Sequence, residues 1–205
     1  MKKVKKFKYY IIIIIAIFVN FSIVNAEKKK LLKNIPIFNN EIYLETKLSF
    51  NSKNQIDWSN QFELQEIDNK KKIFKLENKN FKILRHVIYN HKNVTIEDHY
   101  TNKTNKTIGI ISKYKIKDKN LKKITVSGHE TKDKFKIIAE NPTILINSKK
   151  LSYGIYIKDL FSKIYTNVNI TSNNEFELNN DNLILKPNKK YVKILEIDIF
   201  DKKFK

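Results

Sequence analysis

The chain has no cysteine, only three glycines and three prolines, and a single tryptophan among its 205 residues. Without cysteine it can form no disulfide and offers no thiol for catalysis or lipid attachment. A loop that cradles nucleotide phosphates needs several glycines at fixed spacing, which three scattered glycines do not supply. We therefore predict a fold held together by a packed core alone, with no cofactor.

Arginine is almost absent as well. Arg85 is the only arginine among 41 basic residues, although the formal net charge is +20. This charge favours anionic partners, but recognition of bases and phosphates relies on the arginine fork. Lysine is also abundant together with isoleucine and asparagine, which is typical of an A+T-rich coding sequence, so much of the charge is expected on solvated faces. We predict no nucleic-acid partner and keep polysaccharide or an anionic envelope polymer as candidates.

The N-terminus has the pattern of an export signal. Five lysines between Lys2 and Lys8 precede an apolar run from Tyr9 to Val19, and small residues allow cleavage after Ala26. The run is shorter than the roughly 20 apolar residues of a membrane span. The alternative is an uncleaved anchor, in which case the protein meets the membrane only through this segment. We predict an exported, bacterial protein in the periplasm, at the cell surface or outside the cell.

The rest of the chain consists of short segments in which β-branched and aromatic residues alternate with polar ones, which predicts strands. These segments are residues 41–50, 56–67, 72–76, 81–89, 94–100, 107–116, 122–126, 135–139, 143–146, 154–157, 164–170, 175–178, 183–185 and 191–200. Many short strands with brief connections, and one short helix at most near 158–163, predict an all-β fold, an antiparallel β-sandwich. We predict a signal peptide at 1–26, an N-terminal extension at 27–40 and the sandwich domain at 41–205.

A doubled Asn-Lys-Thr lies at residues 102–107, between two predicted strands. Asn and Thr in such a connection satisfy local backbone groups. Acceptor sequons for glycosylation also occur there at Asn102 and Asn105, and elsewhere at Asn93 and Asn169. In an exported bacterial protein we interpret the doublet as a turn.

Three stretches together resemble a known family. They are the strand 94–100 followed by Thr-Asn-x-Thr and a glycine, then Glu-Asn-Pro-Thr at 140–143 with the strand from Gly154 to Asp159, and last the Leu-x-Leu-Lys-Pro-x-Lys of 183–189 before a long strand. Over residues 81–201 the chain is similar to the β-super-sandwich domain of the galactose-mutarotase-like superfamily. Such domains accompany the catalytic barrels of polysaccharide lyases and several glycoside hydrolases.

The resemblance implies a mainly structural role for Asn102, which matches the family asparagine that braces a hairpin. It implies catalysis by a separate barrel in the lyases, and the chain ends soon after its last strand, so we expect no barrel here. The mutarotases act with a histidine and a glutamate on the sandwich. Their pattern does not match residue by residue, so we assign no catalytic residue.

Histidines are few, but His86, His91 and His99 lie close in sequence to Glu97 and Asp98. Side chains on one face of adjacent antiparallel strands can share a ligand, which would allow a metal site or an acid–base pair. Alternation sends His99 and Asp98 to opposite faces, and no close metal-binding spacing occurs. We therefore favour scattered surface histidines and predict no metal site, while retaining His86 and His99 as candidate ligand-binding residues.

Aromatic side chains could stack on sugar rings. Trp58 lies in a polar run and is the best candidate for an exposed platform, and Tyr100 is a further candidate for ligand binding. Most of the other tyrosines alternate with apolar neighbours and are expected to fill or edge the core.

These observations leave three functional hypotheses. We favour an exported, non-catalytic β-sandwich module that binds carbohydrate, or accompanies its processing, at the cell envelope. The alternatives are a small mutarotase- or lyase-like enzyme using His86 or His99 with Glu97 or Glu140, and a structural or truncated remnant of a larger carbohydrate-active protein.

Overall fold

The structure is a computed structural model. It describes residues 31–32, 34–38, 42–52, 55–59, 61–131, 136–138, 143–149, 151–159, 162, 164, 166–172 and 175–200. The predicted signal peptide lies outside the described residues. Within the described part, no helix is both long enough and apolar enough to span a membrane.

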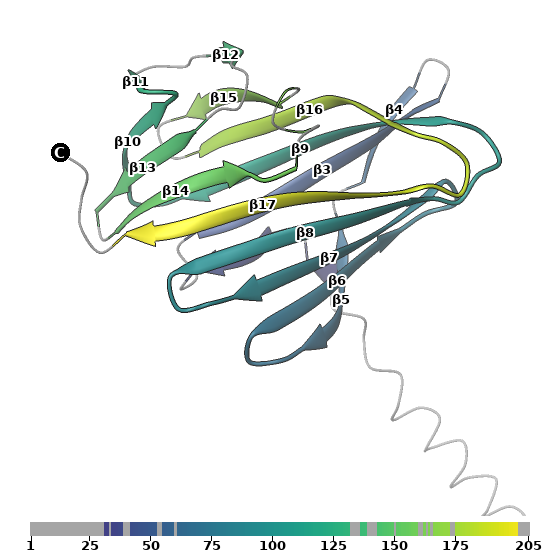
Figure 1. Cartoon of the computed structure of the whole chain (residues 1–205), viewed down its shortest axis with the longest axis horizontal. Helices are drawn as coiled ribbons and strands as arrows, with labels where there is room; N and C mark the ends of the chain where they lie inside the picture. Colours follow the sequence, from purple (N-terminus) through teal and green to yellow (C-terminus); the bar gives the residue numbers. More distant parts are fainter. Residues whose placement is uncertain are drawn as a thin grey trace, which may run out of the picture. The chain divides into compact units, whose positions relative to one another are not determined.

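The larger sheet holds ten of the described strands, all paired antiparallel, with β17 between β8 and β14 near its middle (Figure 1). In spatial order they are β1 (Leu31–Leu32), β5 (Phe62–Ile67), β6 (Lys71–Glu77), β7 (Phe81–Tyr89), β8 (Asn93–Asn102), β17 (Lys190–Phe200), β14 (Ser152–Ile157), β13 (Ile144–Ser148), β10 (Leu121–Val126) and β11 (His129–Thr131).

The smaller sheet holds seven described strands, also antiparallel. In spatial order they are β12 (Lys136–Ile138), β15 (Thr166–Ser172), β16 (Glu175–Leu185), β9 (Ile108–Asp118), β3 (Ile42–Ser52) and β2 (Asn34–Phe38), with β4 (Gln55–Ser59) paired to β3. β9 is central and pairs along its length with both β16 and β3.

The two sheets pack face to face through their alternating residues. Along β7, β8 and β9 every second residue is buried, as the period of two in the sequence predicts. The core is built mainly from isoleucine, leucine, valine and aromatic side chains of both sheets. An all-β antiparallel sandwich is therefore confirmed.

The Asn-Lys-Thr doublet is a turn, as predicted, and connects β8 in one sheet to β9 in the other. Asn102 is buried, and its side-chain amide donates to the carbonyls of Lys106 at 2.8 Å and Leu185 at 2.9 Å. Its Oδ1 accepts from the backbone amide and the hydroxyl of Thr104, both at 2.8 Å. Because the Asn102 amide is fully engaged, this sequon is part of the structure and not a free acceptor.

Several boundaries differ from the prediction. The run 56–67 divides into β4 and β5, which belong to different sheets, and the runs 175–178 and 183–185 join into β16. Residues 31–32 and 34–38, within the segment predicted as an N-terminal extension, form β1 and β2 of the sandwich. Period-two alternation marks faces well but does not mark where a chain leaves one sheet for the other.

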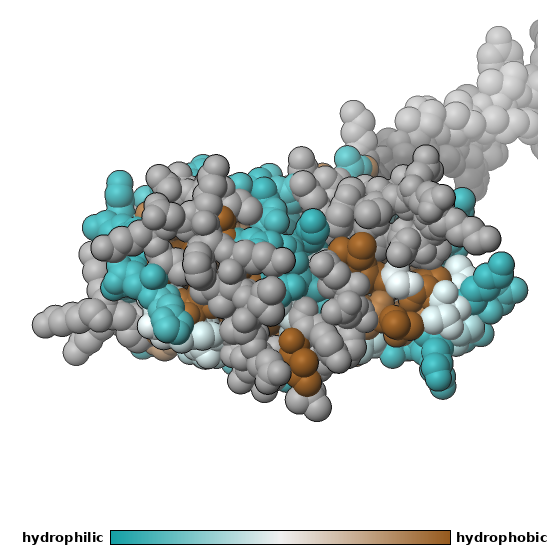
Figure 2. Space-filling view, turned by 90° about the horizontal axis from the view of Figure 1, so that it is seen from above, coloured by the Kyte–Doolittle hydropathy of each residue, from teal (hydrophilic) through white to brown (hydrophobic). Residues whose placement is uncertain are grey.

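Among the described residues, the exposed large hydrophobic side chains belong to separate segments. They are Leu31, Ile67, Ile164, Ile184 and Val192. In the view of Figure 2 hydrophobic residues are visible at several places, with hydrophilic residues beside them.

Candidate site on the outer face of the ten-stranded sheet

Two neighbouring strands, β7 and β8, place polar residues on both faces of the large sheet. His86 lies directly opposite Glu97, and Leu84 lies opposite His99, in the antiparallel register. Since alternate residues point to opposite faces, His86, Glu97 and His99 share the outer face. Arg85 and Asp98, also paired in this register, point into the core.

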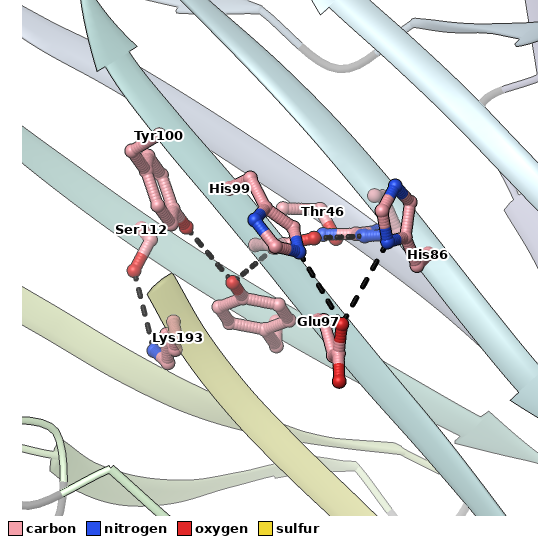
Figure 3. A network of polar contacts seen from close by, with 10 residues as sticks. Thr46, His86, Glu97, His99, Tyr100, Ser112 and Lys193 are labelled. Atoms are coloured by element: carbon pink, nitrogen blue, oxygen red, sulfur yellow. Dashed lines mark hydrogen bonds and ion pairs between the residues drawn. The ribbon is translucent and has the colours of Figure 1, made fainter. Parts of the chain in front are cut away.

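The three outer residues contact one another (Figure 3). His99 Nε2 lies 3.3 Å from Glu97 Oε2, and His86 Nδ1 lies 3.7 Å from the same oxygen. The two imidazole rings are 4.6 Å apart between centroids and tilted by 44°. The side chains are accessible, with 21% of His86, 29% of Glu97 and 37% of His99 exposed to solvent. The site is therefore a compact group of one carboxylate and two imidazoles open to solvent.

Its electrostatics favour a neutral His86. Partial burial, followed by electrostatic repulsion from Lys71 and His99, lowers the pKa of His86, and Glu97 opposes the shift. A neutral imidazole retains a lone pair that can accept a proton or bind a metal ion. The cluster therefore has the donor atoms for acid–base, hydrogen-bonding or metal chemistry.

The surroundings on the same face are mixed in character. Ile73 and Ile194 flank the His86–Glu97 pair in register, and Val192 lies beside His99. These side chains are partly or well exposed, so the cluster sits on an amphipathic surface and not in a deep cleft.

Two strands away, Tyr156 lies on the same outer face. β14 pairs with β17 in the register Tyr156 to Glu196, and Glu196 pairs in turn with Thr95 of β8. The Tyr156 side chain lies against Gly154, because a Cβ built on Gly154 would meet its Oη at 2.7 Å and its Cζ at 3.0 Å. The ring is half-buried and therefore presents part of its surface to solvent.

Beneath the outer cluster, Arg85 and Asp98 form a buried ion pair. Arg85 Nε donates to Asp98 Oδ1 and Arg85 Nη2 donates to Asp98 Oδ2, both at 2.6 Å. Arg85 Nη1 donates to Thr46 Oγ1 at 2.7 Å, which reaches the opposite sheet. The guanidinium carbon also lies 4.4 Å from the centre of the Phe62 ring. This network joins β7, β8 and β3 and holds the strands that carry the outer cluster.

The buried network continues to Tyr114, which donates to Asp98 Oδ2, and to Tyr100, whose hydroxyl lies 2.9 Å from that of Tyr114. Burial raises the pKa of both phenols, so both stay protonated at neutral pH. Lys193 completes the group, with Nζ 3.4 Å from Ser112 Oγ and 4.2 Å from the centre of the Tyr114 ring (Figure 3). Burial lowers the pKa of Lys193 to about 8.

A hollow of about 410 Å³ lies at one end of the smaller sheet and is lined by Asn34, Tyr43, Lys117, Asp118, Lys119 and Glu175. Its charges are mostly engaged, since Lys117 binds Glu45 at 2.7 Å and Asp118 accepts from Tyr153 at 3.0 Å. These contacts brace the end of the sandwich, so we place the candidate site elsewhere.

The predicted site residues have different outcomes. His86 and His99 lie together with Glu97, so the expectation of scattered surface histidines is wrong for these two, while His91 lies in the exposed turn between β7 and β8. Tyr100 is fully buried and cannot stack on a ligand, because its inward position on β8 places it in the core. Trp58 lies on β4 opposite Ser49, and its side chain is outside the described part, as is Glu140.

Sequence reasoning missed the inner network and Tyr156. Arg85 carried a signal, since a lone arginine in a lysine-rich chain indicates a position that requires the bidentate fork. Tyr156, two residues after Gly154, carried a weaker one, because glycine in a strand often marks close packing of a neighbouring group. Lys193 carried a signal as well, because it lies two residues before Leu195 on the apolar face of its strand, where alternation predicts a buried side chain.

No protein-family model and no curated protein sequence matches the chain. Solved structures do match its fold. A galactose mutarotase-like protein from Lactobacillus casei ATCC 334 matches with a TM-score of 0.55 and 7% identity, over 77% of this chain and 85% of that one. A protein from Synechocystis sp. PCC 6803 matches with a TM-score of 0.53 and 8% identity, over 78% of both chains.

A third structure, of a candidate aldose 1-epimerase from Escherichia coli K12, matches with a TM-score of 0.50 and 8% identity, over 68% of both chains. At such identities the likeness concerns the fold alone. The chain has a galactose-mutarotase-like β-sandwich fold, as the resemblance in the sequence implied.

Proposed function

We propose that this galactose-mutarotase-like sandwich is an exported module that binds carbohydrate without transforming it. The proposed binding surface is the outer face of the ten-stranded sheet between the His86–Glu97–His99 cluster and Tyr156. The observation that carries the proposal is the combination, on one accessible face, of a partly exposed tyrosine ring and a cluster of hydrogen-bonding side chains.

The chemistry of this face suits a sugar. A pyranose presents apolar C–H faces that pack on an aromatic ring and hydroxyls that donate to and accept from polar side chains. Tyr156 supplies the ring, and Thr95, Glu97 and the two histidines supply polar atoms in neighbouring rows of the sheet. An open sheet face can also accept an extended polymer, which an enclosed pocket cannot.

A binding role is favoured over catalysis by the arrangement of Glu97. Both histidines approach the same carboxylate oxygen, Oε2, so this oxygen is held between two partners. Catalysis also gains from exclusion of water, and the cluster is open to solvent.

A mutarotase-like activity is the second candidate, because one observation favours it. His99 and Glu97 lie within 3.3 Å on a fold shared with mutarotase-like proteins. In such a reaction a base removes the proton of the anomeric hydroxyl while an acid protonates the ring oxygen. The ring C–O bond then breaks to give the aldehyde, and closure on the other face returns both protons. Polarimetry of freshly dissolved α-glucose and α-galactose tests this candidate, and a rate equal to that of buffer would eliminate it.

Binding of purified protein to neutral and anionic polysaccharides at low and high salt tests the main proposal. Contacts to sugar that rest on stacking and hydrogen bonds persist at high salt, whereas lysine-driven binding to anionic polymers is screened. We expect salt-resistant binding to at least one glycan and a loss of about tenfold in Tyr156→Ala, which corresponds to roughly 1.4 kcal/mol. Tyr43→Ala, a half-buried tyrosine of the smaller sheet, is the matched control. Binding that vanishes in salt, or that is insensitive to Tyr156→Ala, would refute the proposal.

Export forms part of the same proposal. Cleavage after Ala26 gives a mature chain that begins at Glu27. Intact-mass measurement of the protein recovered from the cell envelope tests this, and recovery of the uncleaved chain in the cytoplasm would contradict it.

A further inference from the structure

We propose that His86, Glu97 and His99 form a binding site for a divalent transition-metal ion of the Zn²⁺ class, with at least one coordination position open to solvent. This inference goes beyond the proposed sugar binding and does not depend on it. It also departs from the sequence-based prediction of no metal site.

The positions of the ligand atoms support a shared ion. One nitrogen of each histidine and one carboxylate oxygen all lie within 4.8 Å of one another. A tetrahedral ion with bonds of about 2.0–2.2 Å holds its ligand atoms roughly 3.3–3.6 Å apart. The contacts of Glu97 Oε2 with His99 and His86, 3.3 and 3.7 Å, already approach this spacing. A small rotation of the exposed rings would bring the two histidine nitrogens to the same spacing from each other.

The donor set selects the class of metal. Two imidazoles and one carboxylate suit Zn²⁺, Ni²⁺ or Cu²⁺, whereas Ca²⁺ and Mg²⁺ prefer sites made of oxygen ligands alone. Three protein ligands leave a fourth position for water or another donor, as in open zinc sites. The partial exposure of all three side chains makes this position accessible.

The strands hold the three proposed ligands close together even without a metal ion. His86 is fixed opposite Glu97 by the β7–β8 ladder, and Glu97 and His99 are two residues apart on one strand. The buried Arg85–Asp98 pair ties the same two strands together directly beneath. The ligands therefore come from rigid strands, which lowers the cost of bringing them together.

One nearby charge opposes metal binding. Lys71 lies opposite Ile88, which is two residues from His86 on the same outer face, so its positive charge lies near the proposed ion. The negative charge of Glu97 offsets it in part. Removal of this lysine should therefore increase the affinity for the metal ion. If the three residues only form hydrogen bonds with one another and bind no ion, the substitution should have no such effect on metal affinity.

The test is titration of the untagged protein with Zn²⁺, with binding measured by calorimetry and by competition with a chromophoric chelator. We expect one equivalent bound, a loss of at least about tenfold in His86→Ala, His99→Ala and Glu97→Gln, and a gain of a few-fold in Lys71→Ala. His91→Ala and His129→Ala are matched controls, because both histidines are exposed and lie away from the cluster. Equal affinity in wild type and in the His86→Ala/His99→Ala double variant would overturn the inference.

A second measurement locates the ion. Substoichiometric Cu²⁺ or Ni²⁺ should broaden the imidazole proton signals of His86 and His99 before those of His91 and His129. Uniform broadening of all four would also overturn the site. Glycan binding measured with and without Zn²⁺ separates the two proposals, since Zn²⁺ bound to protein that ignores every glycan leaves the metal site standing and removes the sugar proposal.

Discussion

Arg85 and Asp98 face each other across two central strands in the dry interior of the sandwich, joined by two parallel hydrogen bonds of 2.6 Å. Arg85 is wholly buried, Asp98 is 1% exposed, and the guanidinium also reaches Thr46 of the opposite sheet. Burial alone would lower the pKa of Arg85, but the proximity of Asp98 raises it overall, so the guanidinium stays charged. Two buried charges are tolerated because each satisfies the other.

The first prediction concerns this pair. Arg85→Met should destabilise the protein by about 3–5 kcal/mol, because Asp98 is then buried without its counter-ion. Arg85→Lys keeps the charge but cannot form two parallel bonds or reach Thr46, so it should lose a substantial part of the same stability. Urea unfolding followed by far-UV circular dichroism measures both. A cost below about 1 kcal/mol for Arg85→Met would show that the pair does not hold the core.

Alternation in the sequence predicted the sandwich and most of its strands because it records which side of each strand is buried. β7 was predicted with its observed bounds, since strong alternation from Phe81 ends at a polar turn. The division of β4 from β5 was missed because a change of sheet leaves the alternation nearly unbroken. Alternation shows which side of a strand is buried. Which strands pair, and in which register, depends on contacts between segments far apart in the sequence, and alternation does not record those contacts.

The candidate site illustrates the same limit. The sequence places Glu97 and His99 on one face, but the contact with His86 depends on the length of the β7–β8 turn, which sets the register. The pairing of Tyr156 with Glu196 joins segments 40 residues apart in sequence, so no local pattern reveals it. The role of Asn102 in the turn was predicted correctly, because its hydrogen-bond partners there, Thr104 and Lys106, are close to it in sequence.

The second prediction concerns the doubled Asn-Lys-Thr. Asn102→Ala should cost about 2–4 kcal/mol, because four hydrogen bonds are lost and the buried carbonyl of Leu185 loses a donor. Asn105→Ala is the matched control within the same turn, since Asn105 is exposed, and its effect should stay within about 0.5 kcal/mol. Thermal and urea unfolding measure both variants. Equal effects of the two substitutions would contradict the assigned role of Asn102.

The third prediction concerns Gly154 and the ring that lies against it. In Gly154→Ala the new methyl group would meet Tyr156 Oη at 2.7 Å, so the ring must move away. Tyr156 is half-buried and flexible at its far end, so we expect a stability loss of no more than about 1 kcal/mol. Glycan affinity should fall to the level of Tyr156→Ala while Zn²⁺ affinity stays unchanged. Unaltered glycan binding in Gly154→Ala would show that the position of the ring is immaterial.

The last prediction starts from Lys193, which is 4% exposed and points into the core beside Tyr114 and Ser112. Burial lowers its pKa from 10.5 to about 8, against the attraction of Asp159 and Asp98 and together with the repulsion of Arg85. Below pH 8 this lysine is charged in both the folded and the unfolded chain, so folding carries the full cost of burying the charge. Between pH 8 and 10.5 the unfolded chain binds the extra proton, so the contribution of Lys193 to stability rises with pH.

This contribution is about 3 kcal/mol, because the pKa of Lys193 falls from 10.5 to about 8 on folding. Above pH 10 the buried tyrosines act in the opposite direction, because their raised pKa keeps them protonated only in the folded state. Lys193→Met should therefore be more stable than wild type at pH 7, with the difference shrinking as the pH rises toward 10. Urea unfolding of both proteins at pH 7, 8, 9 and 9.5 measures the difference, in which the other titrating groups cancel. A constant difference across this range would mean that Lys193 does not change its protonation between the folded and unfolded states.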